Sequence, residues 1–253
     1  MRHLKTIMSV LLLLSAFACA KVHEEELETG TVSFTVSNNP QIADMTRSSV
    51  ADFTSLPSGD DFDIAILDAS SASVWSGKAS EMDAAIQLLE GYYTVKASYG
   101  DETVEGFDKP YFVGEANFTV RGGENIEVPV PVELGNSIVK ISCSQNFVNY
   151  FKAAVFTVKR QNDIASFRYG NGGNDFDAAY ETKGLFIESY KFKVAAVLKT
   201  ENGEYDFEKE YDGIDAATAY AVNFDITNVG GTAISVTFKD EVETVELEDI
   251  ELN

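Results

Sequence analysis

Short segments in which apolar and polar residues alternate recur along almost the whole chain, and this period of two is typical of half-buried β-strands. In residues 31–37, for example, Val32, Phe34 and Val36 fall on one face. Gly, Asn and Asp separate the runs, as turns require. No segment predicts a long helix, so the sequence indicates an all-β fold built of sandwiches. Strands are expected at residues 31–37, 62–66, 92–99, 116–121, 126–134, 154–159, 164–169, 190–198, 219–226, 233–238 and 243–252, with another beginning at Ser137.

Two segments carry additional signals. Residues 80–89 fit either a helical turn, capped by the first serine, or a strand over residues 84–88, and both alternatives stay open. Pro129 and Pro131 lie on the outer face of the strand expected at residues 126–134. Because proline has no N–H group to donate, this strand is expected at a sheet edge or leaving its sheet.

A weak internal repeat divides the chain into two parts. Residues 88–97 are echoed by residues 185–194, at a distance of about one β-sandwich domain. The natural boundary is Gly135-Asn136, which separates two series of strands. The linker is too short for free tumbling. We therefore expect two tandem antiparallel β-sandwich domains, transthyretin-like or immunoglobulin-like, over residues 30–135 and 136–253.

The first copy of the repeat predicts a tight corner before a strand. Gly91 permits a positive φ, and Tyr93 can bury its ring while its hydroxyl finds a partner at the corner. Tyr190 is the matching tyrosine of the second copy. The spacing L-x-x-G-x-Y-x-V, which begins at Leu88, resembles the signature of transthyretin-like and carboxypeptidase-regulatory-like sandwiches. The motif is structural and implies no ligand by itself.

The N-terminus has the composition of an export signal. A basic start precedes the apolar residues 7–14, and the small residues Ala16-Phe17-Ala18 then lead to Cys19. This order resembles a lipobox, so residues 1–18 are expected to be a lipoprotein signal peptide. Cys19 is then the lipidated first residue, followed by a flexible tether over residues 19–29. Ordinary cleavage is the alternative, because the same small residues satisfy the small-x-small rule. No later apolar run approaches the ~20 residues that span a bilayer.

Histidine is almost absent from the chain. His3 and His23 are the only two, and both precede the first expected strand. Ser-His-Asp and Cys-His catalysis therefore lack a base, and His-ligated zinc lacks ligands. Nothing in the sequence suggests the cleft that a catalytic carboxylate pair needs. We expect no enzyme, no cofactor and no metal. The formal net charge of −22 also argues against nucleic acid and against anionic membrane surfaces as partners.

A few residues are candidates for specific roles. Cys143 shares a strand face with Val139 and Ile141, which indicates a small buried hydrophobe. Residues 170–177 and the cluster Asp60, Asp61 and Asp63 carry oxygen ligands that suit Ca²⁺, but a plain loop and a solvated turn are the favoured interpretations.

The aromatic residues allow one further hypothesis. Trp75 and Tyr111 are candidate ligand contacts, because aromatic faces stack on sugar rings. Burial of Trp75 in the sandwich is the favoured alternative, since large aromatic side chains fill cores. The hypothesis is a glycan-binding platform made of Trp75, Tyr92, Tyr99, Tyr111 and Phe112.

The central part of the chain carries a family resemblance. The stretch GFDKPYFVG at residues 106–114, the residues FTV at 118–120 and the pair Asn136-Ser137 resemble an uncharacterised family of Bacteroidetes outer-membrane lipoproteins, defined as a domain of unknown function. The pattern is matched over residues 88–141, with Glu90 where the family often has Ala, and the later strands fit it as well. The layout is similar to that of fimbrillin-like and fimbrial-anchor lipoproteins, which have two transthyretin-like sandwiches behind a lipid anchor.

The resemblance implies a role. In fimbrillins, proteolysis after an arginine removes the first strand and a neighbour's donor strand fills the gap, which makes Arg47 a candidate cleavage site here. A solvated loop arginine is the alternative. We expect a non-catalytic lipoprotein of the outer membrane and cell surface, with a structural or adhesive, fimbria-related role. Its expected partners are the membrane, through the lipid, and protein subunits or glycans. Two alternatives stay open: a glycan-binding accessory lipoprotein of an outer-membrane nutrient-uptake system, and a periplasm-facing attachment.

Overall fold

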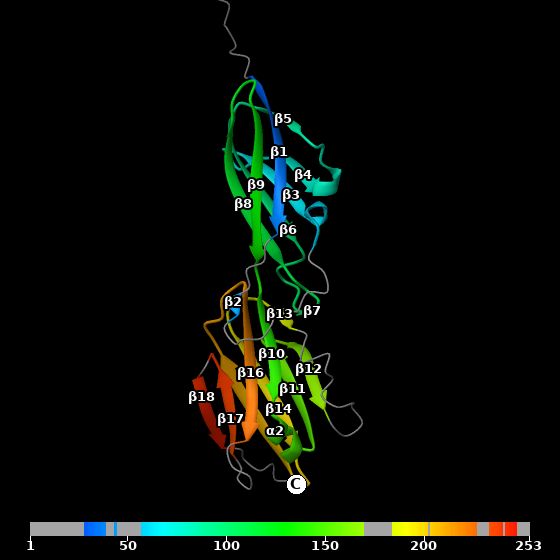
Figure 1. Cartoon of the computed structure of the whole chain (residues 1–253), viewed down its shortest axis with the longest axis vertical. Coiled ribbons are helices and arrows are strands. Elements are labelled where there is room, and N and C mark those ends of the chain that lie inside the picture. The colour runs from blue at the N-terminus through cyan, green and yellow to red at the C-terminus, as the bar shows by residue number, and fades with distance from the viewer. Residues whose placement is uncertain are drawn as a thin grey trace, which may run out of the picture.

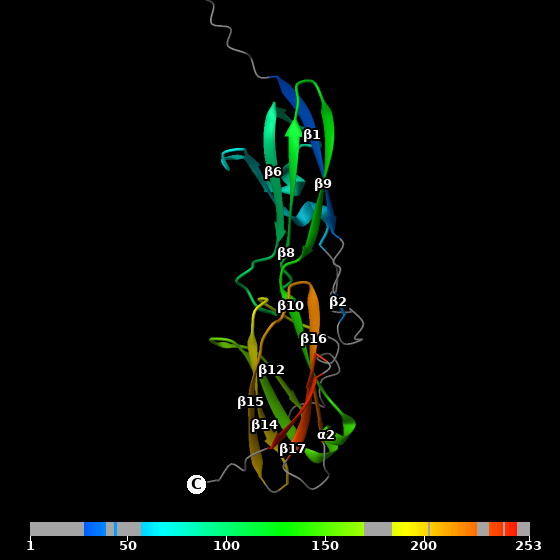
Figure 2. The same cartoon turned by 90° about the vertical axis from the view of Figure 1, so that its left-hand side faces the viewer.

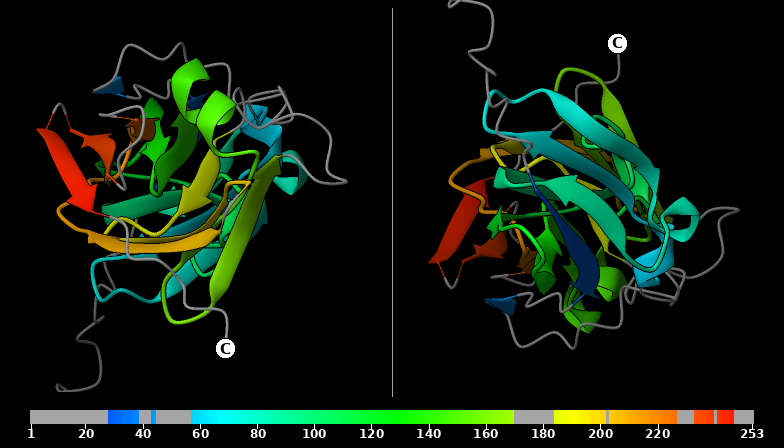
Figure 3. Two further views of the ribbon diagram at one scale, coloured as in Figure 1. Left: turned by 90° about the horizontal axis from the view of Figure 1, so that it is seen from below. Right: turned by 90° about the horizontal axis from the view of Figure 1, so that it is seen from above.

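The computed structural model describes residues 28–38, 43–44, 57–169, 184–201, 203–226, 233–239 and 241–246. The molecule is elongated, with an N-terminal half and a C-terminal half stacked along its long axis (Figures 1 and 2). Seen along that axis, the two halves overlie one another (Figure 3). Cys19, Arg47 and the loop at residues 170–177 lie outside the described residues.

The N-terminal half is a two-layered β-sandwich. Its strands follow one another in the order β4-β3-β6-β8-β9-β1-β5. Strands β8 and β9 pair only at Phe112 with Leu134 and at Val113 with Glu133, so the sheet divides there into two layers that face each other. Side chains of both layers, such as Val32 and Val95, form one core. The strands are β1 (Thr29–Asn38), β3 (Asp63–Asp68), β4 (Ser73–Lys78), β5 (Ile86–Leu89), β6 (Gly91–Tyr99), β8 (Phe112–Val120) and β9 (Asn125–Leu134).

The C-terminal half is a second sandwich with its own core. One sheet has the order β18-β17-β16-β10-β13-β7, with β2 (Ala43–Asp44) beside β16, and the other has the order β12-β11-β14-β15. The short helix α2 (Gln145–Tyr150) is capped by Ser144 and buries Phe147 in this core. The strands are β7 (Gly106–Phe107), β10 (Ser137–Cys143), β11 (Ala153–Lys159), β12 (Asp163–Tyr169), β13 (Leu185–Ile187), β14 (Phe192–Lys199), β15 (Glu204–Tyr211), β16 (Thr218–Ile226), β17 (Ala233–Phe238) and β18 (Glu241–Glu246).

The two halves share one topology. The layer order β4-β3-β6-β8 in the first matches β12-β11-β14-β15 in the second, and β9-β1-β5 matches β16-β10-β13. The seven strands of the first half therefore correspond one by one, in chain order, to β10 through β16. The weak sequence repeat covers β5 with β6, and then β13 with β14. We propose that the chain divides into two domains at Gly135-Asn136, between β9 and β10.

The all-β sandwich fold is confirmed, but the sheets are mixed and not antiparallel throughout. In each half the first of the seven matched strands pairs in parallel with the seventh, β1 with β9 and β10 with β16. β2 also runs parallel to β16. Alternation of residues specifies which faces are buried and carries no information on which strand lies alongside, so the sequence could not predict these pairs.

The segments left open in the sequence are now resolved. For residues 80–89 the alternatives were a helical turn and a strand over residues 84–88. The structure has a 3₁₀ turn at residues 79–81 and then strand β5 at Ile86–Leu89, so the strand alternative is the closer one. Strand β9 pairs with β1 from Asn125 to Val132 and reaches β8 only at its end. It thus leaves one layer for the other, as Pro129 and Pro131 predicted.

The tyrosine corner is confirmed in one copy only. The Tyr93 ring is buried, and its hydroxyl donates to the Leu89 carbonyl oxygen at 2.9 Å. Gly91 does not use the positive φ that glycine permits: its backbone is outside the left-handed region. Tyr190 is 62% exposed, and β14 begins only at Phe192. The Tyr190 N–H donates to the Glu188 carbonyl oxygen at 3.0 Å, so the chain turns before that strand starts.

Tyr211 offers a test of core energetics. Its side chain is 3% exposed and its ring stacks on Phe192 at 5.2 Å between centroids, but its hydroxyl has no hydrogen-bond partner among the described residues. Burial raises the pKa of this phenol. Because Tyr211→Phe removes an unpaired buried polar group, we expect it to stabilise the protein by about 1 kcal/mol in urea unfolding.

Tyr93→Phe is the matched control for this prediction. It deletes a hydroxyl that is hydrogen-bonded, to the Leu89 carbonyl, and should destabilise the protein by about 1 kcal/mol. Equal losses of stability in both variants would show that the Tyr211 hydroxyl has a partner in solution.

Candidate functional site at the junction of the two halves

Residues 100–111 connect β6 to β8 and reach across to the C-terminal half. Within this loop, β7 pairs with β13 through Phe107 with Leu185 and Gly106 with Phe186. Gly100 and Gly106 have φ of +84° and +144°, values that glycine adopts at little cost and other residues rarely adopt. A strand of the first half's chain thereby completes a sheet of the second.

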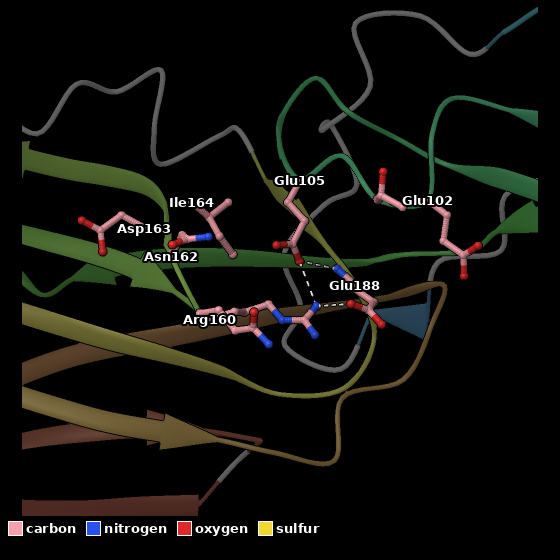
Figure 4. A pocket seen from close by; sticks show the side chains of 9 residues that line it. Glu102, Glu105, Arg160, Asn162, Asp163, Ile164 and Glu188 are labelled. Carbon is pink, nitrogen blue, oxygen red and sulfur yellow. Dashed lines mark hydrogen bonds and ion pairs between the residues drawn. The ribbon is translucent and has the colours of Figure 1, made fainter.

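An ion-pair cluster lies beside this pairing (Figure 4). The Arg160 Nη1 lies 3.0 Å from Glu105 Oε1 and 2.6 Å from Glu188 Oε2, and the Glu188 N–H donates to Glu105 Oε1 at 2.8 Å. Burial lowers the pKa of Arg160, but hydrogen bonds and charges from Glu105 and Glu188 more than offset this, so its pKa is raised. Arg160 therefore remains a cation that joins a carboxylate of each half.

An open cleft of about 630 Å³ surrounds this cluster. Its charged lining comes from both halves: Glu102 and Glu105 belong to the first, and Arg160, Asp163 and Glu188 belong to the second (Figure 4). The cleft has no imidazole, and its one guanidinium is already bound by two carboxylates. Across the described residues, no three His, Cys, Asp or Glu side chains are placed to hold a metal ion. The arrangement suits mechanical connection better than acid–base chemistry.

Asn136 forms a second connection, deeper in the junction. It is 5% exposed; its Oδ1 accepts from the Tyr111 N–H at 3.3 Å and its Nδ2 donates to the Lys109 carbonyl at 3.0 Å. Its own carbonyl accepts from the Ala217 N–H at 3.1 Å. One buried residue thus binds the loop of the first half through its side-chain amide and a loop of the second through its backbone carbonyl. Sequence reasoning treated Asn136 only as linker; its place beside Ser137 in the family pattern was the available signal.

Apolar contacts complete the junction. Ile138, Phe186 and Ala219 belong to strands of the C-terminal half but pack in the core of the N-terminal half. The two sandwiches therefore share apolar surface as well as polar bonds, and bending between them would expose it.

The structure does not bring the two candidate ligand contacts together. Trp75 lies opposite Ile66 in the β3–β4 ladder and packs against the N-terminal core. Tyr111 lies at the junction, where an added Cβ on Gly135 would be 2.6 Å from its ring. Burial, and then the charges of Glu102 and Asp101, raise the pKa of Tyr111. Among the described residues, no ring contact joins Trp75 or Tyr111 to the other tyrosines of the hypothesised platform.

The remaining candidates have structural surroundings. Asp60 and Asp61 lie in a 3₁₀ turn capped by Ser58, and Asp63 pairs with Lys78 at 2.8 Å. Cys143 is half-buried and packs against the C-terminal core. No helix in the described part of the chain is long and apolar enough to cross a membrane.

Comparison with known proteins gives one family and a set of solved structures. A family model described as "Domain of unknown function (DUF4493)" matches residues 28–253. Curated proteins give no match.

Three of the similar solved structures come from Bacteroides and Parabacteroides species. A "putative cell adhesion protein" from Bacteroides eggerthii DSM 20697 is 10% identical, covers 87% of this chain and 96% of its own, and has a TM-score of 0.45. "Putative polysaccharide binding proteins" from Bacteroides thetaiotaomicron VPI-5482 are 10% identical, cover 86% of this chain and 98% of their own, and have a TM-score of 0.44. A "fimbrial assembly protein" from Parabacteroides distasonis ATCC 8503 is 8% identical, covers 88% of this chain and 99% of its own, and has a TM-score of 0.43.

Proposed function

We propose a role for this chain, which belongs to the family Domain of unknown function (DUF4493): it is a non-catalytic lipoprotein of the cell surface with a structural or adhesive function. The observation that carries the proposal is the junction. Two sandwiches of one topology are stacked end to end and joined by a shared strand, the Arg160 cluster and the buried Asn136. Such a body holds its far end at a fixed distance from its attachment point.

The place where the described chain begins supports this view. Strand β1 starts at Thr29, at the end of the N-terminal half away from the junction (Figure 1). A lipid on Cys19 and the tether expected over residues 19–29 would attach the molecule at that end. The C-terminal half would then be the part presented farthest from the membrane.

Replacing Cys19 tests the anchor. When the protein is expressed in a Bacteroides host with radiolabelled palmitate, we expect label in the wild-type chain and background label in Cys19→Ala. The reason is that alanine has no thiol to carry the lipid, whose acyl chains would supply the apolar area that holds the protein in a bilayer. Cys143→Ala, which removes the other cysteine, is the control and should keep its label.

A second experiment tests exposure at the cell surface: proteinase digestion of intact cells should degrade the wild-type chain. An unlabelled wild-type chain, or one that resists proteinase until cells are lysed, would contradict the proposal.

A fimbria-related role is the finer form of the proposal. Strand β1 lies between β5 and β9 and contributes the buried Val32, so removing it would open the N-terminal core to a donor strand. Arg47 follows β1 in the sequence. Mass spectrometry of the surface-extracted chain shows directly whether it has been cleaved after Arg47. A first residue at Ser48 supports strand exchange, whereas a chain that starts at Cys19 and stays monomeric in unboiled gels argues against it.

A further inference from the structure

We propose that the outer surface of strands β6 and β8, beside the β3–β4 turn, binds neutral carbohydrate, with Tyr92 as the stacking residue. This site is separate from the junction. It lies on the N-terminal half, near the end where β1 begins, and the proposal does not depend on how the chain is anchored.

Tyr92 is the most exposed large apolar side chain in the described part of the chain, at 72%. Its neighbour Tyr93 points into the core, so strand alternation directs Tyr92 outward. Thr119 lies directly opposite Tyr92 in the β6–β8 ladder. An aromatic ring held open to solvent on a rigid sheet loses little conformational freedom when a ligand stacks on it.

Polar groups lie next to this ring. Thr94 and Asn117 form the next outward pair of the same ladder, and the Thr94 hydroxyl donates to Asn117 Oδ1 at 2.7 Å. The amide Nδ2 of Asn117 keeps its two donors for a ligand, since no bond of this group occurs within the described residues. Hydroxyl and amide groups beside an aromatic face match a sugar, which has an apolar C–H face and a rim of hydroxyls.

A concave space of about 400 Å³ extends from Tyr92 to the β3–β4 turn, and this volume falls in the range of small-molecule sites. Asp68 lies in its wall, and Oδ1 accepts from the Ser70 N–H, the Ser70 hydroxyl and the Ala72 N–H at 2.8, 2.6 and 3.0 Å. Asp68 lies opposite Tyr93 in the β3–β6 ladder, so its carboxylate is on the inner face of the sheet, where these three bonds hold the β3–β4 turn in place. Ser71 in the same wall has a φ of +65°, a backbone conformation that costs energy for a serine.

The charge of the chain selects the kind of sugar. The chain as a whole carries a formal charge of −22. Uronic acids, sulfated sugars and phosphates would be repelled, whereas neutral sugars would not be. The ligand class is therefore neutral polysaccharide.

The test uses purified full-length protein in non-ionic detergent on a microarray of polysaccharides. The neutral probes are mannan, xylan, galactan and β-glucan, and the acidic probes are alginate and polygalacturonate. We expect binding to at least one neutral probe and to neither acidic one. Tyr92→Ala should weaken that binding by about tenfold, since it removes both the stacking contact and the apolar area that the ring buries against the sugar. Asn117→Ala should weaken it too, and Tyr92→Phe should keep most of it.

Tyr190→Ala is the matched control, because Tyr190 is a second tyrosine of similar exposure, 62%, on the other half. It should bind within about twofold of wild type. Unfolding midpoints in urea show that each variant is folded. The proposal is overturned if the wild type binds no neutral probe, if acidic probes bind equally well, or if Tyr92→Ala and Tyr190→Ala bind alike. Cys19→Ala separates the two proposals, since it should lose palmitate and keep carbohydrate binding.

Discussion

Gly100→Ala is expected to destabilise the protein by about 4 kcal/mol, of which roughly 1–2 comes from a left-handed alanine and the rest from a steric clash. Gly100 has a φ of +84°, and an added Cβ would lie 2.3 Å from the Pro110 carbonyl oxygen. That oxygen belongs to backbone and cannot rotate away. The next residue, Tyr111, is held by Asn136, so the loop cannot yield without breaking the junction.

Gly123→Ala separates strain from clash. Gly123 has a similar φ of +73°, but an added Cβ would meet nothing within 4 Å. Its alanine variant should lose only about 1–2 kcal/mol, the cost of the left-handed conformation. The measurement is urea unfolding of both variants beside the wild type. Equal losses in the two variants would mean that the junction loop adapts, and that the contact with Pro110 carries no stability.

Arg160→Ala is expected to cost about 2–3 kcal/mol, because it removes two charge-assisted hydrogen bonds and leaves two carboxylates facing each other. Arg160 is only 20% exposed, so water replaces the lost partners poorly. The loss should have a structural effect as well, since Glu105 and Glu188 come from different halves. Small-angle scattering should show a broader distribution of distances between the two halves in the variant.

Lys193→Ala provides the comparison for Arg160→Ala. Lys193 pairs with Glu208 at 3.1 Å on the exposed surface of the β14–β15 hairpin, inside one half. Surface pairs of this kind contribute ~0.5 kcal/mol, and the scattering curve should not change. If Arg160→Ala is no worse than Lys193→Ala in both measurements, the Arg160 cluster does not hold the halves together.

Strands that alternate clearly between core and solvent were predictable, and edge strands with weak alternation were not. β1, β3, β6 and β9 all fall within a few residues of their expected places, because each alternates clearly between core and solvent. β4 and β15 were missed. Both are edge strands, and the charged β15 buries only Phe207 and Tyr211, so its alternation is weak.

The site was less accessible to sequence reasoning than the fold. Tyr93 could be placed at its corner because Leu89, its hydroxyl's partner, is four residues away. Arg160 and Glu105 are 55 residues apart, and nothing local marks either of them. The favoured interpretation of Trp75, packing in the sandwich, agrees with its place against the N-terminal core, and only the register of β4 against β3 directs it there.

The sequence by itself determined the all-β class, most of the inward faces, the repeat that reflects a duplicated topology, and the absence of histidine beyond residue 23. These are properties of composition and of neighbours along the chain. Tertiary structure alone decided the parallel pairs β1–β9 and β10–β16, the reach of β7 into the second sheet, and the isolation of Tyr92 on an outer face. The physical reason is that hydrogen-bonding partners and exposure depend on residues far away in the chain, and periodicity records only which side of a strand is apolar.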